Sequence, residues 1–135
     1  MPGGFYYYMR GVLVAGRKIL VFEDDQFVAM AVNDVLSYAG YSVSIFEKGG
    51  AGAKKIVMDA NPDLIIMDMK LANNTDGLTT ARLISEISDT PIVFMSAFAK
   101  EIDQADLKNA NFFAILEKPF NKNRLLNVVK MVFGD

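Results

Sequence analysis

The stretch Lys18-Ile19-Leu20-Val21-Phe22-Glu23-Asp24-Asp25 runs from a mostly apolar segment directly into three acids. A continuous apolar run of this length is typical of a strand that is buried on both faces of a parallel sheet. Acids that follow such a strand lie at its carboxyl end, which is where open α/β sheets bind their ligands. This stretch therefore predicts the first strand of a parallel sheet with a functional site at its end.

Four further apolar runs of strand length follow, and segments with the apolar spacing of helices separate them. The runs cover residues 41–46, 63–67, 91–95 and 112–116. The helical stripes are Phe27, Ala31, Val35 and Tyr38; Ala53, Ile56, Val57 and Ala60; Leu78, Ala81, Ile84 and Ile87; and Leu125, Val129 and Val132. A helix is also expected over residues 99–109, where the apolar stripe is thin.

Local signals mark where several of these helices begin and end. Asp76 and Asn121 are suited to cap the starts of two helices with their side-chain oxygens. Gly40 and Pro62 follow two others as stop signals. Strand and helix thus alternate five times along the chain. This alternation predicts an α/β fold with a doubly wound, five-stranded parallel sheet flanked by helices on both faces.

The composition excludes several kinds of chemistry. Without cysteine or histidine, the chain has no disulfide, no thiol nucleophile and no histidine base or metal ligand. Any metal would need oxygen ligands, which favours a hard cation such as Mg²⁺. The formal charge of −2 shows no basic surplus for nucleic-acid binding. No apolar run approaches the roughly 20 residues of a membrane span, and a cytoplasmic location is expected.

The first 17 residues do not fit the alternating pattern, so we predict an N-terminal extension over residues 1–17 and a single domain over residues 18–135. The extension contains Tyr6-Tyr7-Tyr8 and a short apolar run, and it lacks a clear secretory cleavage signal. Three interpretations stay open: an added expression sequence, a start codon upstream of a true start at Met9, or a loosely packed extension. The first two are favoured.

Polar residues follow four of the predicted strands. Glu23 and Asp24 follow the first strand, Asp68 the third, Ser96 the fourth and Lys118 the fifth. Neighbouring carboxylates raise one another's pKa or require a cation, and Mg²⁺ keeps coordination positions open for phosphate. In such a site Asp68 can attack phosphorus, Lys118 can offset charge on the transferred group, and the Ser96 hydroxyl can hydrogen-bond a phosphoryl oxygen.

Five short pieces of sequence occur in one order: residues 19–25 (ILVFEDD), residues 63–68 (DLIIMD), Asp76-Gly77, Ser96-Ala97 and Lys118-Pro119-Phe120. Together they resemble the receiver domains of response regulators, including those of the chemotaxis-regulator kind, over nearly the whole chain from residue 18 to about residue 133. The resemblance implies a flavodoxin-like, receiver-type fold and a place in two-component signalling.

The resemblance also implies roles for the acids and for the loops beside them. Asp68 is the implied phosphoacceptor, Asp24 a direct Mg²⁺ ligand, and Glu23 a residue that acts on the metal through water. The backbone carbonyl of Lys70 is expected to complete the metal shell. Lys70 and Phe98 flank the implied path of the hydrolytic water, and the bulky Phe98 is expected to slow hydrolysis of the acyl phosphate.

The switch that would follow phosphorylation is matched in part. Ser96 corresponds to the switch hydroxyl and Lys118 to the lysine that pairs with phosphate, and the Lys118–Pro119 peptide bond is expected to be cis. The aromatic residue that commonly reports switching is replaced by Ile115. The loop over residues 72–75 lacks the usual proline and is expected to be one residue longer than the shortest family version.

The implied function is a phosphoacceptor domain that turns over no external substrate. Its expected partners are a sensor histidine kinase or phosphotransfer protein and a downstream protein target or output domain. The contact face is expected on the last two strand–helix units, which include Ile115. Whether the chain forms a homodimer is left open.

Three alternatives compete with this interpretation. A magnesium-dependent phosphatase or hydrolase would usually have a second acid two residues after its nucleophile, where this chain has Lys70. A flavodoxin-like cofactor binder needs a phosphate-binding loop after the first strand, where three acids would repel phosphate. A receiver-shaped module that is never phosphorylated would gather these charges without a metal or phosphate to satisfy them. The glycine-rich residues 49–52 follow the second strand and are expected to form a turn into a helix, not a P-loop.

Overall fold

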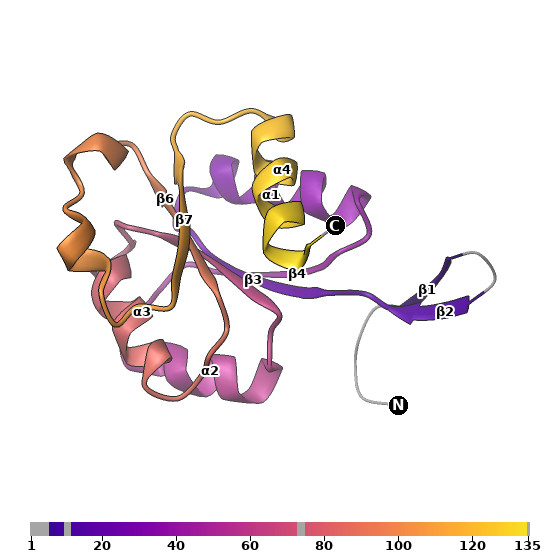
Figure 1. The fold of residues 1–135 in the computed structure, drawn as a ribbon, viewed down its shortest axis with the longest axis horizontal. Helices are drawn as coiled ribbons and strands as arrows, with labels where there is room; N and C mark the ends of the chain where they lie inside the picture. The colour runs from indigo at the N-terminus through magenta and orange to yellow at the C-terminus, as the bar shows by residue number, and fades with distance from the viewer. Residues whose placement is uncertain (1–5, 10–11, 73–74, 135) are drawn as a thin grey trace.

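The computed structural model describes residues 6–9, 12–72 and 75–134, with side chains from residue 16 onward. Its centre is a five-stranded parallel sheet of strand order β4-β3-β5-β6-β7 (Figure 1). The strands are β3 (Lys18–Phe22), β4 (Ser42–Phe46), β5 (Leu64–Asp68), β6 (Ile92–Ser96) and β7 (Phe112–Glu117). The predicted doubly wound sheet is confirmed, and its strand order reverses at β3.

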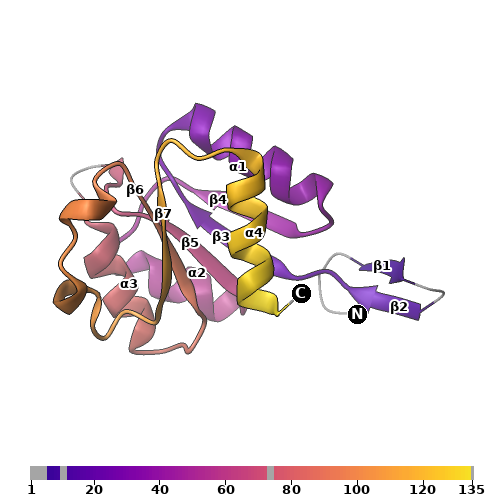
Figure 2. The same cartoon turned by 45° about the horizontal axis from the view of Figure 1, so that its top comes forward.

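Two helices cover each face of this sheet (Figures 1 and 2). They are α1 (Gln26–Tyr38) and α4 (Lys122–Phe133) on one face, and α2 (Gly52–Ala60) and α3 (Gly77–Ser85) on the other. Because side chains alternate along a strand, Ile19 and Val21 pack on the α1 and α4 side, whereas Leu20 and Phe22 pack on the α2 and α3 side. The sheet is thereby buried on both faces, as its continuous apolar runs predict.

The predicted capping residues and most of the predicted helix stripes are confirmed. Asp76 accepts a hydrogen bond from the Leu78 amide at the start of α3, and Asn121 caps α4. The buried residues of these helices include Ala53, Val57, Ala81, Ile84, Leu125 and Val129. Ile87 departs from its predicted stripe because it lies beyond the end of α3 and is 40% exposed.

Most of the predicted buried face of α1 is wrong, although its Val35 is partly buried against the core. Phe27 and Tyr38 are 85% and 96% exposed, and the buried positions are Ala29, Val32 and Leu36. This helix carries apolar residues around most of its circumference, so more than one stripe has helical spacing. Contact with β4 and α4 decides which stripe is buried, and that contact cannot be read from the helix alone.

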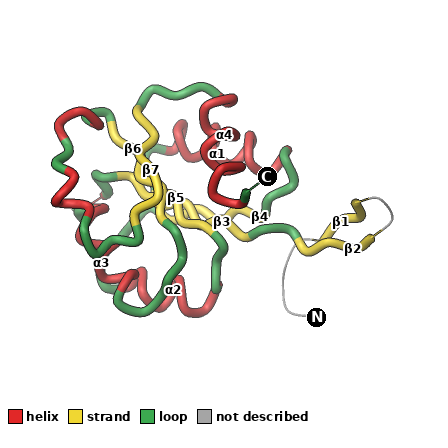
Figure 3. The backbone as a smooth tube through the Cα atoms, in the orientation of Figure 1, coloured by secondary structure: helices red, strands yellow, loops and turns green. Residues whose placement is uncertain are grey.

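The α-helix expected over residues 99–109 is also wrong. This segment forms two 3₁₀ helices, η2 (Ala99–Glu101) and η3 (Gln104–Leu107). Figure 3 draws helical stretches in red and the loops between them in green. The Asp103 side chain accepts a hydrogen bond from the Ala105 amide and starts the second short turn. Asn109 and Asn111 adopt positive φ values of 67° and 46°, which end helical structure before β7. The thin apolar stripe does not supply enough burial for a longer helix.

The N-terminal segment forms a hairpin in which β1 (Tyr6–Met9) pairs antiparallel with β2 (Val12–Ala15). In both views the hairpin projects away from the five-stranded sheet (Figures 1 and 2). The predicted boundary at residue 17 falls between the end of the hairpin and the start of β3. Residues 1–5 and 10–11 of the predicted extension lie outside the described residues. No helix in the described ranges is long and apolar enough to span a bilayer.

Removing residues 1–16 is expected to change the free energy of unfolding by less than about 0.5 kcal/mol, because an isolated two-stranded hairpin is itself only marginally stable. Arg17 must be kept, since its carbonyl accepts from the Ser42 amide at 2.8 Å and its guanidinium lies 4.9 Å from the centre of the Phe133 ring. Urea denaturation measures the change. A loss above about 1 kcal/mol would show that the hairpin belongs to the folded domain.

Candidate functional site

The ends of four strands bring the predicted site residues together. Glu23 and Asp24 directly follow β3, Asp68 ends β5, and Ser96 ends β6. A hollow of about 360 Å³ lies at this edge of the sheet. It is lined by Asp24, Asp25, Asp68, Met69, Lys70, Leu71, Ser96, Ala97, Phe98 and Lys118. Five of the six predicted site residues therefore face one cavity, and Glu23 is buried beside it.

Lys118 connects two of the strand ends through its ammonium group. Its Nζ lies 2.7 Å from Glu23 Oε1 and 3.0 Å from Asp68 Oδ2. Glu23 is 1% exposed and Asp68 is 7% exposed, so both contacts are shielded from solvent. Charge-assisted hydrogen bonds of this length are stronger than neutral ones and hold the lysine at the edge of the site. The Lys118–Pro119 peptide bond is cis, as predicted.

The charges in this cluster shift one another's titration. The pKa of Glu23 is raised to about 8, because burial and, after it, the nearby Asp68 raise it more than Lys118 lowers it. Burial would lower the pKa of Lys118, but its hydrogen bonds to Glu23 and Asp68 raise that pKa above its usual value. A carboxyl that resists ionisation beside another carboxylate indicates a site that lacks positive charge. A second cation at this site would relieve the deficit.

The carboxylates offer ligands for such a cation. Oxygen atoms of Glu23, Asp24 and Asp68 all lie within 4.8 Å of one another. Three close carboxylates suit a hard divalent ion such as Mg²⁺, which binds oxygen and keeps several of its waters. Asp24 is exposed, and within the described part of the chain its side chain has no hydrogen bond or ion pair, so it is available as a ligand. The roles of the Lys70 carbonyl and of a water on Glu23 stay predictions.

The backbone after β5 folds back tightly onto Asp68. The Lys70 amide donates to Asp68 Oδ1 at 3.1 Å, and Lys70 forms an antiparallel bridge with Asp76. At position 77 a Cβ atom would overlap the carbonyl oxygen of Asp68, so Gly77 is required for this approach. Sequence reasoning noted Asp76-Gly77 but missed this contact. A glycine in the first turn of an otherwise regular helix was the available signal.

Ser96 and Phe98 also line the cavity, and they are hydrogen-bonded to each other. The Phe98 amide donates to Ser96 Oγ at 3.0 Å. The Lys70 ammonium lies 5.1 Å from the centre of the Phe98 ring, which is a cation–π contact across the mouth of the site. Ile115 packs against the core on the α2 and α3 side. In the predicted loop over residues 72–75, Asn73 and Asn74 lie outside the described residues.

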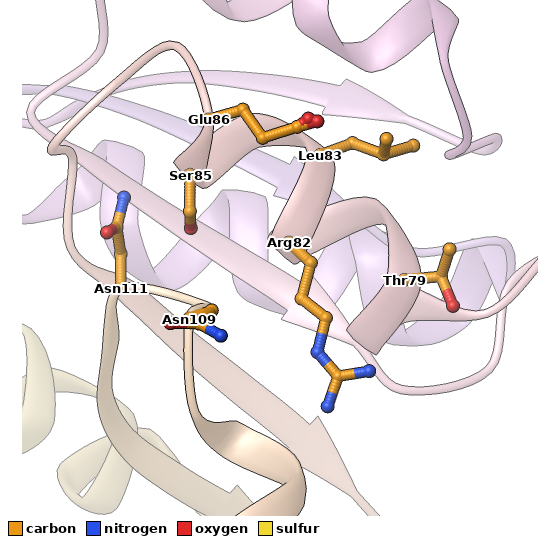
Figure 4. Close-up of a pocket in the computed structure, with 7 residues that line it drawn as sticks. All are labelled: Thr79, Arg82, Leu83, Ser85, Glu86, Asn109 and Asn111. Atoms are coloured by element: carbon orange, nitrogen blue, oxygen red, sulfur yellow. The ribbon is translucent and has the colours of Figure 1, made fainter.

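A separate pocket of about 490 Å³ lies between α3 and the segment that leads into β7 (Figure 4). It is lined by Thr79, Arg82, Leu83, Ser85, Glu86, Asn109 and Asn111. The Arg82 guanidinium donates to the backbone carbonyl of Asp106 and so joins α3 to η3. None of the predicted site residues lines this pocket.

A doubly wound parallel sheet with three carboxylates, a hydroxyl and a lysine at its strand ends defines the chain as an α/β protein with a charged site at one edge of its sheet. The sequence profile of the response regulator receiver domain matches residues 19–130. The chain therefore belongs to the receiver domain family of response regulators, the phosphorylation modules of two-component signalling.

Individual relatives agree with this assignment. The polar-differentiation response regulator DivK of Brucella ovis is 25% identical over 122 residues, which cover 88% of this chain and 98% of DivK. The receiver domain of sensor histidine kinase PA1611 from Pseudomonas aeruginosa PAO1, solved with magnesium coordinated in its active-site cleft, is 27% identical with a TM-score of 0.78. That match covers 90% of this chain and 100% of the solved one.

A third relative is longer than this chain. The protein-glutamate methylesterase/protein-glutamine glutaminase of Archaeoglobus fulgidus is 38% identical over 84 residues, which are 62% of this chain but 24% of that relative. The match thus spans about a quarter of the relative's length. It supports the receiver family and carries no methylesterase activity to this chain.

Saturating Mg²⁺ is expected to raise the thermal unfolding midpoint. At a Mg²⁺ concentration one hundred times the dissociation constant, the free energy of unfolding rises by about 2.7 kcal/mol. Asp24→Asn should lose most of this gain because a carboxylate is removed from the cluster. Circular dichroism during heating, repeated at increasing Mg²⁺ concentrations, measures the unfolding midpoints of the unaltered protein and of Asp24→Asn. Asp25→Asn is the matched control, since Asp25 caps α1 through the Phe27 and Val28 amides and asparagine caps equally well. An equal response of both variants would contradict the predicted ligand.

Proposed function

We propose that this receiver domain accepts a phosphoryl group on Asp68 in a Mg²⁺-dependent reaction. The donor is the phosphohistidine of a sensor histidine kinase or phosphotransfer protein, and the product switches contacts with a downstream protein or an output domain. The observation that carries the proposal is the Lys118 ammonium, bonded to both Glu23 and Asp68 at the edge of a carboxylate-lined cavity. We further propose that the domain works in the cytoplasm and turns over no external substrate.

The contacts of Asp68 support its role as the nucleophile. A carboxylate oxygen of Asp68 attacks phosphorus, the bond from phosphorus to the donor imidazole nitrogen breaks, and the imidazole leaves with that electron pair. The Lys70 amide and Lys118 hold the two carboxylate oxygens before the reaction. Mg²⁺ would supply charge compensation for the carboxylates and for the transferred group. Lys118 can follow the developing charge onto a phosphoryl oxygen.

The part of the cavity wall that Ser96 and Phe98 form supports the switching step. The Ser96 hydroxyl lines the cavity and accepts from the Phe98 amide, which leaves its proton free to donate to a phosphoryl oxygen. A shift of Ser96 toward the phosphate would move the backbone at Phe98, whose amide is bonded to the Ser96 hydroxyl, and with it the short turns η2 and η3 that follow. Ile115 has no polar end to reorient, so its contribution is a change in packing on the α2 and α3 side.

An exposed apolar surface beside the site is suited to the phosphodonor protein. Phe27 is 85% exposed on α1 and borders a hollow of about 500 Å³. That hollow is lined by Phe27, Val28, Ala31, Ala97, Lys118, Pro119 and Phe120. Lys118 lines this hollow and the cavity of Asp68, so a protein seated here would reach the phosphoacceptor. Downstream contacts are proposed for the face that carries Ile115, and a homodimer stays open.

Incubation with a small phosphodonor and Mg²⁺ is expected to add one phosphoryl group to the intact mass. Asp68→Asn should abolish the gain because an amide is a poor nucleophile, and removal of Mg²⁺ with a chelator should abolish it in the unaltered protein. Asp89→Asn, an exposed acid away from the strand ends, is the control and should be labelled normally. Equal labelling of Asp68→Asn would exclude Asp68 as the acceptor. Steady release of phosphate from a generic phosphomonoester would instead favour a hydrolase.

Phe98→Ser is expected to speed loss of the phosphoryl group by about two- to fivefold, because it removes the ring that lies under Lys70 at the mouth of the cavity. The decay of the phosphorylated mass after donor removal gives the rate. Phe27→Ser is the matched control, since Phe27 is an exposed phenylalanine that does not line the cavity of Asp68. An unchanged or slower decay in Phe98→Ser would contradict the shielding role.

A further inference from the structure

We infer that Thr80 is a positioning residue for the phosphorylation site, because it ties the loop after Asp68 to the glycine-rich turn before α2. The inference rests on the proposed function of Asp68 and goes beyond it to a residue that lies outside the cavity. Thr80 lies in α3 and has no exposed surface. The glycine-rich residues 49–52 take no part in the proposed phosphorylation chemistry, and contact with Thr80 gives them a structural role.

The Thr80 hydroxyl makes two hydrogen bonds in opposite directions. Its Oγ1 accepts from the Gly50 amide at 2.8 Å and donates to the Asp76 carbonyl at 3.0 Å. Gly50 belongs to the turn between β4 and α2, and Asp76 is the capping residue of α3. A single buried hydroxyl thus joins the turn at Gly50, which lies 30 residues before Thr80, to the loop that ends at Asp76. Buried groups with both partners in place hold their surroundings firmly, and loss of one partner is costly.

The anchor continues from Asp76 into the loop that follows the phosphoacceptor. Asp76 bridges to Lys70, and the Leu71 amide donates to the Thr75 carbonyl at 3.0 Å. The Gly77 amide donates to the Met69 carbonyl at 3.0 Å. These contacts pair residues 69–71, directly after Asp68, with residues 75–77. Fixing Asp76 therefore fixes the position of Lys70, whose amide holds one oxygen of Asp68.

The glycine at position 49 is explained by the same contact. A Cβ atom there would overlap Thr80 Oγ1 and would approach Leu71 Cδ1 to 2.9 Å and Thr75 Cγ2 to 3.1 Å. Gly50 adopts a positive φ of 81°, which favours glycine. Residues of the turn thus approach both Thr80 and the loop that Thr80 anchors. Figures 1 and 2 place α2 and α3 side by side on the same face of the sheet, which brings the turn to this position.

Thr80→Val tests the inference, because valine keeps the shape of threonine and removes both hydrogen bonds. In metal-free protein, exchange of the Leu71 and Gly77 amides should quicken by about three- to tenfold, the range expected for one lost hydrogen bond. The Mg²⁺ dissociation constant, measured by calorimetry, should rise by a similar factor. Thr80→Ser keeps the hydroxyl and should restore both values. If Thr80→Val does not fold, Thr80→Ala replaces it.

Thr79→Val is the matched control, because Thr79 is the exposed neighbour whose hydroxyl contacts the Asp76 side chain and not the glycine-rich turn. It should leave amide exchange and Mg²⁺ affinity within about twofold of the unaltered protein. Equal effects of Thr79→Val and Thr80→Val, or no rescue by Thr80→Ser, would overturn the inference. Absence of Mg²⁺ binding and of labelling in the unaltered protein would instead contradict the proposed function. The amide exchange rates in metal-free protein would still show whether Thr80 holds the loop after Asp68.

Discussion

The Lys118 ammonium is the contact on which the candidate site depends, because two buried carboxylates share it. Loss of one partner of a buried ion pair leaves an uncompensated charge and costs about 3–5 kcal/mol. The lysine therefore supports the fold and the chemistry together. If it turns toward a phosphoryl oxygen, Glu23 loses its nearest cation, and a divalent ion between Glu23, Asp24 and Asp68 would replace that charge.

The backbone around Asp68 explains why the carboxylate is held in one orientation. Its two oxygens have different donors, the Lys70 amide and the Lys118 ammonium. The first donor is placed by a tight loop that closes against Gly77, and the second by a strand end two strands away. An attacking group that is fixed before the donor arrives loses less freedom in the reaction. Because both oxygens of Asp68 are held, movement is left to the part of the cavity that Ser96 and Phe98 line.

The residues at the strand ends could be predicted from sequence, because a parallel sheet brings the carboxyl ends of its strands to one edge. Correct prediction of the strands was therefore enough to place Glu23, Asp68 and Lys118 together. The orientation of α1 could not, since the helix is apolar on several sides and its neighbours select the buried one. The α-helix predicted over residues 99–109 was wrong for a related reason, because helical spacing of apolar residues without enough burial does not stabilise a helix. The Thr80–Gly50 bond joins two loops and leaves no periodic signal in either.

The segment that follows Ser96 has the physical properties of a moving element. Its two 3₁₀ turns bury Leu107 but leave Phe98 54% exposed, and 3₁₀ turns hold their hydrogen bonds less well than an α-helix does. Segments with few buried apolar contacts open at low free-energy cost. Ile115 can only repack, whereas Phe98 is joined to Ser96 through its amide and to Lys70 through its ring. A phosphoryl group bound in the cavity that Ser96 and Lys70 line would therefore lie next to both contacts of Phe98, whereas Ile115 packs against the core.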